Sequence, residues 1–371
     1  MLGAIALGAG GLLTAAPADA VPSGGGAHRT VYVAPDGSPS ARDDSCSHAR
    51  FTSIQDAIEA VASGGTVVVC RGTYHGSVTI DRKVTLAGRP GATIDATGMP
   101  YGVGVTVSYV TIRGLTVKNA GPLTPQSLAD GILTGGFGPS GPIAADHLTI
   151  VDNTVTGNLG SGIDLNSTSY SVAVGNRAIG NGVGINVADD LGPPATHNLI
   201  AGNVANENFG GCGIALADHT GAGIADNLVV HNVADDNGLS TPTAPNASAG
   251  SGVIIASPVP GGIVSGNTIA FNSFDGNGHG GVVMHSHAPG SDFHGNVVSG
   301  NRIGTNNLRT DVSDPKTTGI YLASASPQTI TVSGNVIGPD YFGVFTAGDI
   351  SVQGHNTYRG VDVRLGHVDT Y

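Results

Sequence analysis

Two short polar segments of this 371-residue chain hold the side chains best suited to chemistry. Asp189 and Asp190 end one alternating apolar run, and Asp218 and His219 end the next run at the same position. Two carboxylates brought close together repel each other, so they bind a cation, share a proton or take on separated pKa values. Acid–base cleavage of glycosidic bonds uses such pairs, and calcium binds them through their oxygens. Solvated turns, in which aspartate is common, are the alternative interpretation.

A group of four histidines within sixteen residues is the second candidate: His279, His285, His287 and His294. His285 and His287 are two residues apart on one alternating run, so both side chains can point outward. Neutral imidazole is a competent base or metal ligand near pH 7. The spacing matches no closed zinc motif and includes no thiolate. A polar turn with incidentally exposed rings is the alternative.

A repeat positions these side chains. From about residue 150 onward, asparagine pairs with a constant offset of five residues recur, and each is followed by a glycine, then Ile or Val, and an alternating run. Alternating runs of three to five residues are short strands, and Gly-Asn allows a left-handed turn at little steric cost. The pairs are Asn153/Asn158, Asn176/Asn181, Asn203/Asn208, Asn227/Asn232, Asn267/Asn272 and Asn296/Asn301, followed by Asn335 with Asp340.

Stacking of such units predicts the fold. Each unit supplies about three short strands to three parallel sheets, and stacked asparagine amides hydrogen-bond between units. We therefore expect an all-β, single-stranded, right-handed parallel β-helix over residues 51–371. A two-sheet sandwich would place turns every 8–12 residues without a constant offset. An apolar helical face after Ser53 predicts a capping helix at about residues 53–63.

Registry between units predicts which residues meet on the outward face of the glycine-led strand. One outward column is Leu133, Asp164, Asn186, Ala215, Ile254, Val283, Tyr321 and Phe345. A second column, two residues later, is Gly135, Asn166, Ala188, Ala217, Ala256, His285, Ala323 and Ala347. Beyond it, Asp189 falls beside Asp218, and Asp190 beside His219, with backbones about 5 Å apart. Tyr321 and Phe345 predict a platform for sugar rings or a shield for the end of the sheet.

Two long insertions mark the same edge of the repeat. Residues of about 233–251 and 302–318 separate an asparagine pair from the following strand. Loops inserted on one edge of a repeat protein commonly wall a binding face. The outward face of the glycine-led strands is thus the predicted groove, and these strands carry no Lys or Arg.

The composition and charge of the chain limit the kinds of partner that it can bind. The chain has 60 glycines and a net charge of −12, so nucleic acid and anionic membranes are not expected as partners. An apolar stretch from Leu2 to Ala16 and the sequence Ala18-Asp19-Ala20 predict a signal peptide over residues 1–20, cleaved after Ala20. We therefore expect a secreted or extracytoplasmic, monomeric protein without a membrane span, whose residues 21–50 form an N-terminal arm. Cys46 and Cys70 are placed to form a disulfide in an oxidising compartment.

The Gly-Asn and Gly-Ile repeats, together with the run Ile80 to Gly98, resemble the pectate-lyase-like superfamily of right-handed parallel β-helix proteins. The opening segment Phe51–Ile58, with Gly65–Val69 and Gly72–Tyr74, is similar to the start of that fold. The resemblance covers roughly residues 30 to 371. It implies use of the same sheet and loops, but the superfamily includes lyases, epimerases, hydrolases, binding proteins and structural proteins. Pairing of His285 with Tyr321 is similar to uronan lyase and C5-epimerase chemistry, although their full motif is absent.

These features predict an exported protein that cleaves or modifies a polysaccharide by lyase, epimerase or glycoside hydrolase chemistry. The expected catalytic residues are Asp189, Asp218, His219, His285 and His287. The expected substrate-binding residues are Asp164, Asn186, Tyr321 and Phe345. No cofactor is required by these features, and calcium held by Asp189, Asp190 and Asp218 is the one metal option that they leave open. The alternatives are a non-catalytic carbohydrate-binding or cell-surface protein and an exported metal-binding β-helix protein.

Overall fold

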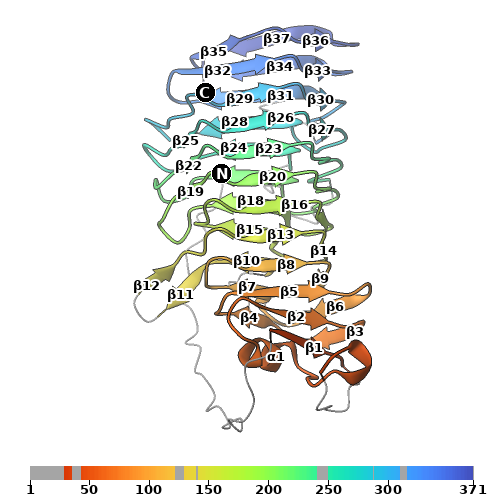
Figure 1. Cartoon of the computed structure of the whole chain (residues 1–371). Coiled ribbons are helices and arrows are strands. Elements are labelled where there is room, and N and C mark those ends of the chain that lie inside the picture. The colour runs from red at the N-terminus through yellow and green to blue at the C-terminus, as the bar shows by residue number, and fades with distance from the viewer. Residues whose placement is uncertain are drawn as a thin grey trace.

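The computed structural model describes residues 29–35, 43–121, 129–138, 141–239, 250–286, 288–309 and 316–370. They form one column of stacked coils, with helix α1 (Ile54–Ala60) at one end and strands β35, β36 and β37 at the other (Figure 1). The strands of each long sheet pair in parallel with the strand one coil away. The predicted all-β parallel β-helix with a capping helix is therefore confirmed. The predicted signal peptide lies outside the described residues.

Sheet I has twelve strands and runs the length of the column. They are β1 (Thr30–Val33), β2 (Gly65–Val69), β5 (Val84–Gly88), β8 (Thr111–Arg113), β13 (Thr149–Val151), β16 (Val172–Val174), β20 (Leu199–Ala201), β23 (Leu228–Val230), β26 (Thr268–Ala270), β29 (Val297–Ser299), β32 (Gln328–Ser333) and β35 (Ile350–Gln353).

Sheet II follows sheet I in each coil and has two segments. The first holds β3 (Gly72–His75), β6 (Ala92–Asp95), β9 (Thr116–Lys118), β14 (Thr154–Thr156) and β17 (Arg177–Ile179). The second holds β27 (Ser273–Phe274), β30 (Arg302–Ile303), β33 (Val336–Ile337) and β36 (Thr357–Tyr358). Single parallel bridges through Val204 and Val233 connect the two segments.

Sheet III has eleven strands and contains the glycine-led strands of the repeat. They are β4 (Val78–Ile80), β7 (Tyr101–Val105), β10 (Asp130–Thr134), β15 (Ser161–Asn166), β18 (Val183–Ala188), β21 (Ile214–Ala217), β24 (Val253–Ala256), β28 (Val282–Ser286), β31 (Thr318–Ser324), β34 (Phe342–Ala347) and β37 (Val363–Val368).

Smaller elements lie between sheet III and sheet I. Strands β19 (Ala195–Thr196), β22 (Ile224–Ala225) and β25 (Val264–Ser265) pair in parallel across three coils. Strands β11 (Gly136–Gly138) and β12 (Gly141–Ile143) form an antiparallel hairpin that projects at the left of Figure 1. Among the residues that the structure describes, the one other helical element is the 3-10 turn η1 (Cys46–His48). Within the described ranges, no helix is long and apolar enough to cross a membrane.

Aliphatic side chains fill the interior of the column. Ile163, Ile185 and Ile214 occupy equivalent positions on β15, β18 and β21, and all are fully buried. Burial of each such side chain contributes about 1.5–3 kcal/mol. At the first coil, α1 shields this interior, and the Ser53 hydroxyl accepts a hydrogen bond from Asp56 N at 3.3 Å, as expected for an N-cap. The Cys46–Cys70 disulfide is present beside this cap.

Three asparagine ladders lock the coils together. The ladder between sheets I and II is Asn153, Asn176, Asn203, Asn232, Asn272, Asn301, Asn335 and Asn356. The ladder between sheets II and III is Asn158, Asn181, Asn208, Asn237, Asn277, Asn306 and Asp340. The third, between sheets III and I, is Asn198, Asn227, Asn267 and Asn296.

The third ladder corrects the predicted alignment of the asparagine pairs. Asn203 stacks on Asn232, the second member of its pair, and not on Asn227. Four coils hold three asparagines at equal five-residue spacing, so two overlapping pairs occur in each of them. Spacing alone therefore did not show which corner a pair occupies.

The two predicted long loops begin within regular coils. Asn237 and Asn306 belong to the ladder between sheets II and III, so the residues before them are part of regular coils of the β-helix. The later parts of the insertions, residues 240–249 and 310–315, lie outside the described residues.

Asp340 ends a ladder of amides with a carboxyl group. Its Oδ1 accepts the backbone N–H of Asn306 at 3.0 Å, whereas its buried Oδ2 has no hydrogen-bond partner. Burial raises the pKa of Asp340 to about 8. The folded protein therefore holds this group protonated at neutral pH, whereas in the unfolded chain it ionises with the ordinary aspartate pKa of 3.8.

We expect Asp340→Asn to stabilise the protein at neutral pH. Because the folded-state pKa of Asp340 is raised, its contribution to stability is complete below pH 3.8 and is lost as the pH rises toward 8. At pH 7 the cost is about 4 kcal/mol, three units at about 1.36 kcal/mol each, as an upper estimate. Urea unfolding at pH 5, 7 and 8.5 should show a gain that grows with pH. Asp369→Asn, at an exposed carboxylate, is the control, and an equal effect of both substitutions would contradict the assignment.

Candidate functional site

The outward columns on sheet III align as predicted. Asp164 on β15 pairs in register with Asn186 on β18, and Asn186 with Ala215 on β21. In the second column, Asn166 pairs with Ala188, and Ala188 with Ala217. Residues distant in sequence thus become neighbours on one face of three consecutive coils.

Polar side chains gather on this face. Asn186 Nδ2 donates to Asp164 Oδ1 at 3.0 Å, and Asn166 Nδ2 donates to Asp190 Oδ2 at 3.4 Å. His219 Nδ1 lies 2.6 Å from Asp190 Oδ1. We call these five residues, together with Asp130, the acidic cluster.

Two carboxyl groups of the acidic cluster are buried. Asp130 accepts the N–H of Ser161 at 2.6 Å through Oδ1, and its Oδ2 has no partner. Burial raises the pKa of Asp130 to about 7. Burial, and then the charges of Asp130 and Asp190, raise the pKa of Asp164 well above its usual value. Asn166 Oδ1 is a further buried oxygen without a hydrogen-bond partner.

His219 and Asp190 form the accessible part of the acidic cluster. The side chain of His219 is 41% exposed and that of Asp190 is 30% exposed. The hydrogen bond to Asp190 raises the pKa of His219, and the charges of Asp190, Asp189 and Asp218 add to this effect. Since Asp190 engages Nδ1, the Nε2 atom is the ring nitrogen that remains for a ligand.

Asp189 holds the loop that carries His219. Its carboxylate accepts hydrogen bonds from the backbone N–H groups of His219 at 2.6 Å and Ala222 at 3.1 Å, and from the Thr220 hydroxyl at 2.6 Å. Burial acts to raise the pKa of Asp189, but hydrogen bonds from Asp218, Thr220 and the backbone outweigh it and lower the pKa. Asp189 is fully buried, so it positions the loop.

Asp218, one coil later, also holds loop backbone through its carboxylate. It accepts the N–H of Gly221 at 2.6 Å and the N–H of Ile263 in the next coil. Burial, and then the hydrogen bond and charge of Asp189, raise the pKa of Asp218 to about 6. Asp189 and Asp218 therefore take separated pKa values, one of the three outcomes that their proximity allows.

The expected calcium site does not fit this geometry. The backbone N–H groups of residues 219, 220, 222 and 223 point at the Asp189 carboxylate, where they occupy the positions that a cation would need. In the described part of the chain, no three His, Cys, Asp or Glu side chains are grouped to hold a metal ion.

The histidine group is divided between two faces. His285 lies on β28, in the second outward column, opposite Ala323 of β31. His287 lies outside the described residues. His279 packs edge-on against Tyr321, with ring centroids 5.2 Å apart, and Tyr321 stacks on Phe345 at 5.9 Å. His294 lies near sheet I, bonded to Asp292.

Comparisons with known proteins agree with this architecture. The family model described as "Right handed beta helix region" matches residues 92–257. The chain is a right-handed parallel β-helix protein. Among curated proteins, none matches its sequence.

Solved structures of other β-helix proteins resemble this one. The A-module of mannuronan C-5 epimerase AlgE4 from Azotobacter vinelandii has a TM-score of 0.59 at 21% identity, covering 91% of this chain and 97% of that one. An alginate lyase from Paenibacillus sp. has a TM-score of 0.55 at 15% identity, covering 85% and 95%. PfbA, a surface adhesin of Streptococcus pneumoniae, has a TM-score of 0.51 at 14% identity, covering 84% and 87%. At these identities, the likeness shows the fold.

Sequence reasoning missed Asp130 as a member of the site in this β-helix protein. Asp130 precedes the glycine that leads β10, but Ser161 stands at the equivalent place on the next coil and Tyr101 on the previous one. Because no acidic residue recurs there, the repeat contained no signal for it. Asn166 was in the predicted second outward column, and this position beside Asp164 could have identified it as a site residue.

Proposed function

We propose that this protein is an exported enzyme that cleaves or modifies a polysaccharide lying along the outward face of sheet III. The pair of His219 and Asp190 carries the proposal. An imidazole whose Nδ1 is engaged by a carboxylate has a fixed orientation and presents Nε2 for proton transfer. The disulfide between Cys46 and Cys70 supports export into an oxidising compartment.

Each remaining member of the acidic cluster has a role in this proposal. His219 Nε2 exchanges a proton with the sugar, and Asp190 orients the ring and stabilises its charged form. Asn186, which bonds to Asp164, supplies an amide group for sugar hydroxyls, whereas the buried Asn166 holds Asp190 in place. Burial raises the pKa values of Asp130 and Asp164, which reduces the negative charge that the three carboxyl groups of the acidic cluster place on this face. Asp189 is a positioning residue, since it holds the backbone of His219.

Polysaccharide is the substrate class that the comparisons support best. Two of the similar structures are named as an epimerase of mannuronan and a lyase of alginate. Along the two outward columns, the described residues of this chain include no Lys or Arg. A chain with few negative charges therefore suits this face better than a densely charged uronan.

Product analysis tests the proposal. Purified protein is incubated with neutral and uronate-containing polysaccharides, and both reducing ends and unsaturated products are followed. New reducing ends alone indicate hydrolysis, unsaturated products indicate a lyase, and a changed ratio of uronate epimers indicates an epimerase. Retention of the protein by a polysaccharide without any product would contradict the enzyme and favour a binding protein.

A further inference from the structure

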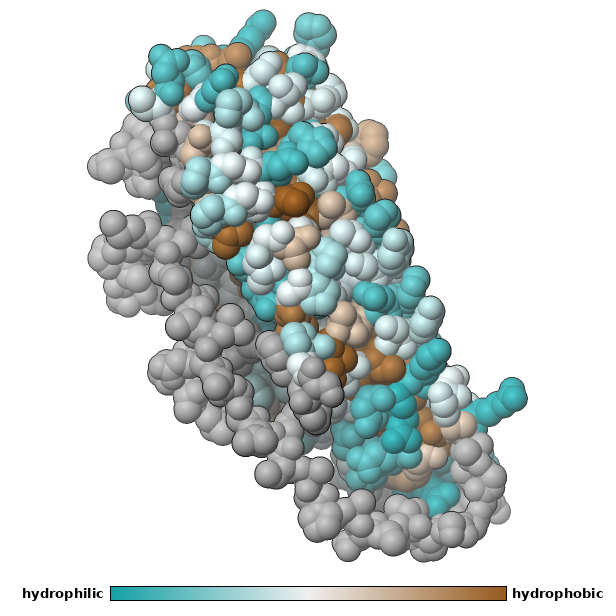
Figure 2. All heavy atoms as spheres, turned by 90° about the vertical axis from the view of Figure 1, so that its left-hand side faces the viewer, coloured by the Kyte–Doolittle hydropathy of each residue, from teal (hydrophilic) through white to brown (hydrophobic). Residues whose placement is uncertain are grey.

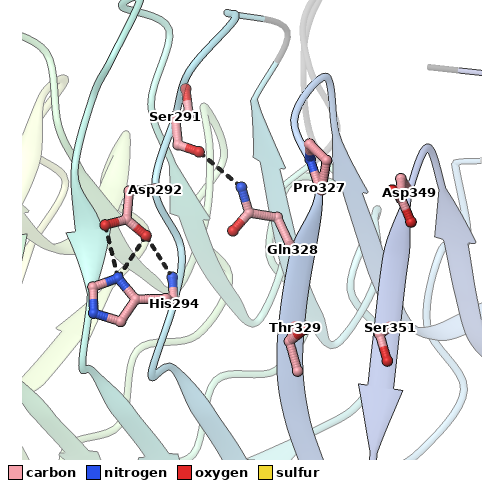
Figure 3. Close-up of a pocket in the computed structure, with 8 residues that line it drawn as sticks. All are labelled: Ser291, Asp292, His294, Pro327, Gln328, Thr329, Asp349 and Ser351. Carbon is pink, nitrogen blue, oxygen red and sulfur yellow. Dashed lines mark hydrogen bonds and ion pairs between the residues drawn. The ribbon is translucent and has the colours of Figure 1, made fainter.

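A polar cavity that is separate from the acidic cluster lies near the C-terminal end of sheet I. Figure 3 shows the residues that line it. Its volume of about 510 Å³ is in the range of small-ligand sites. The lining residues are Ser291, Asp292, His294, Pro327, Gln328, Thr329, Asp349 and Ser351. None of them belongs to the acidic cluster.

A change in coil length produces this cavity. Ten residues separate β28 from β29, but only three separate β31 from β32, and two separate β34 from β35. The ladder between sheets III and I therefore ends at Asn296, and the coil narrows after it. The cavity lies at this step.

Gln328 closes the end of the shortened ladder. Its Oε1 accepts the N–H of Phe293 at 3.1 Å, and its Nε2 donates to the carbonyl oxygen of Ser291 at 2.7 Å. Both bonds reach back to the wider coil, and Figure 3 shows the second of them. The floor of the cavity is therefore fixed before a ligand arrives.

Asp292 fixes the second side of the cavity. Its two carboxylate oxygens lie 2.6 and 2.7 Å from His294 Nδ1, and Oδ1 also accepts the backbone N–H of His294 at 2.9 Å. This arrangement makes Nδ1–H a hydrogen-bond donor to the Asp292 carboxylate and fixes the orientation of the ring. Polar groups held in place in this way lose little entropy when a ligand binds.

The lining selects a ligand rich in hydrogen-bond donors. Asp292 and Asp349 supply carboxylates, Thr329 and Ser351 supply hydroxyls, and no Lys or Arg lines the cavity. Carboxylates accept hydrogen bonds from paired hydroxyl groups and repel uronate, sulfate or phosphate. Sugar hydroxyls match this set of groups.

The outer face of sheet I beside the cavity is also suited to an uncharged ligand. From β13 to β29 the outward side chains of sheet I are aliphatic or hydroxylated, and none is charged: Thr149, Val151, Val172, Val174, Leu199, Ala201, Leu228, Val230, Thr268, Ala270, Val297 and Ser299. Apart from Ala270, which is buried, these side chains are partly exposed, so they form an uncharged face that a ligand without charge can contact. We call it the sheet I strip.

We propose that the cavity and the sheet I strip form a second glycan-binding surface, which holds an uncharged polysaccharide chain away from the acidic cluster. The cavity hydrogen-bonds one sugar unit, and the strip packs against the apolar faces of the units that follow. Such a surface would keep the protein on its polymer between encounters at sheet III and raise the local substrate concentration.

The test measures binding in a background without turnover. His219→Ala protein is compared with His219→Ala/Asp349→Ala protein by affinity electrophoresis in gels that contain xylan, soluble β-glucan, chitosan or alginate. We expect retention by a neutral polymer in the first protein and at least a tenfold weaker affinity in the second. Equal retention of the two proteins, or a preference for a charged polymer (chitosan or alginate), would overturn the proposal.

Two controls complete the test. Thr329→Lys, at an exposed position of β32, places a cation in the cavity and should reduce binding of neutral polymers without disturbing the fold. Leu228→Asp should weaken binding through the sheet I strip. If Leu228→Asp instead abolishes self-association in sedimentation velocity and leaves glycan retention unchanged, the strip is an interface between copies of this chain. Turnover by the wild-type protein, measured separately, reports on the acidic cluster.

Discussion

His219→Ala is expected to lower turnover of the polysaccharide by about 10²–10⁴-fold, the usual contribution of a positioned acid or base. The loss should appear in kcat, because the ring transfers a proton and contributes little to the hold on the polymer. Initial rates with the best substrate of the panel, measured over a range of concentrations, provide the test. His219 is partly exposed and packs into no core, so the variant should fold normally.

A companion substitution separates proton transfer from positioning. Asp190→Asn removes the hydrogen bond that raises the pKa of His219. The limb of the pH–rate profile that reports His219 should therefore move to lower pH, with a smaller loss of kcat than in His219→Ala. His231→Ala is the matched control, because His231 stacks on Phe271 at a corner beside sheet I. Loss of activity in His285→Ala with full activity in His219→Ala would transfer the catalytic role to the other predicted histidine.

Asn203→Ala should reduce the free energy of unfolding by about 3–5 kcal/mol. Asn203 Oδ1 accepts hydrogen bonds from Asn176 N at 2.8 Å and Asn176 Nδ2 at 3.0 Å. Its Nδ2 donates to Ala173 O at 2.8 Å and to Asn232 Oδ1 at 2.9 Å. Truncation leaves several fully buried groups unpaired, at about 1–3 kcal/mol each. Urea unfolding followed by circular dichroism provides the measurement.

Asn206→Ala is the matched control for the ladder. Asn206 lies in the same coil, is half-buried, and accepts one hydrogen bond, from Asp235 N at 3.0 Å. Its truncation should cost at most about 1 kcal/mol. Equal losses for the two variants would show that the asparagine ladder contributes no more than a surface turn.

The fold was predictable because one short repeat fixes both turn and registry. Glycine before asparagine allows the left-handed turn, as at Gly175 and Gly202, which have φ angles of 67° and 62°. The alternating run that follows has an inward and an outward face, so columns such as Asp164 and Asn186 could be aligned from spacing alone. The five-residue spacing does not show which corner of the coil an asparagine pair occupies, because all three corners can carry asparagine. The predicted alignment of the pairs was therefore partly wrong.

The candidate site was less predictable, because proximity does not define orientation. Asp189 was expected beside Asp218, and the two are coupled, but both side chains are buried and hold loops. Each follows an outward alanine, so strict alternation along the strand would have placed it inward. Ser257 and Ser286 take the equivalent inward place on later coils and bond to nearby backbone. That column of polar residues was the available signal for a structural role.

Coil lengths were the third source of information, and they were used for one corner only. The unequal segments before the glycine-led strands were visible in the spacing of the asparagine pairs. The segments after these strands also differ in length, and the connection falls from ten residues after β28 to three after β31. That change produces the step beside Gln328, for which the sequence contains no motif. Hydrophilic and hydrophobic side chains alternate over the face of the column shown in Figure 2, without one large uniform patch.

A crystal structure of His219→Ala protein with an oligosaccharide of the preferred substrate would locate the catalytic face. Sugar density is expected across β15, β18 and β21, with a ring oxygen or hydroxyl beside the space left by the imidazole and in contact with Asn186. Density at the step beside Gln328 is expected as well. Sugar bound at that step, or elsewhere, with an empty outer face on sheet III would contradict the assignment of the acidic cluster as the catalytic site.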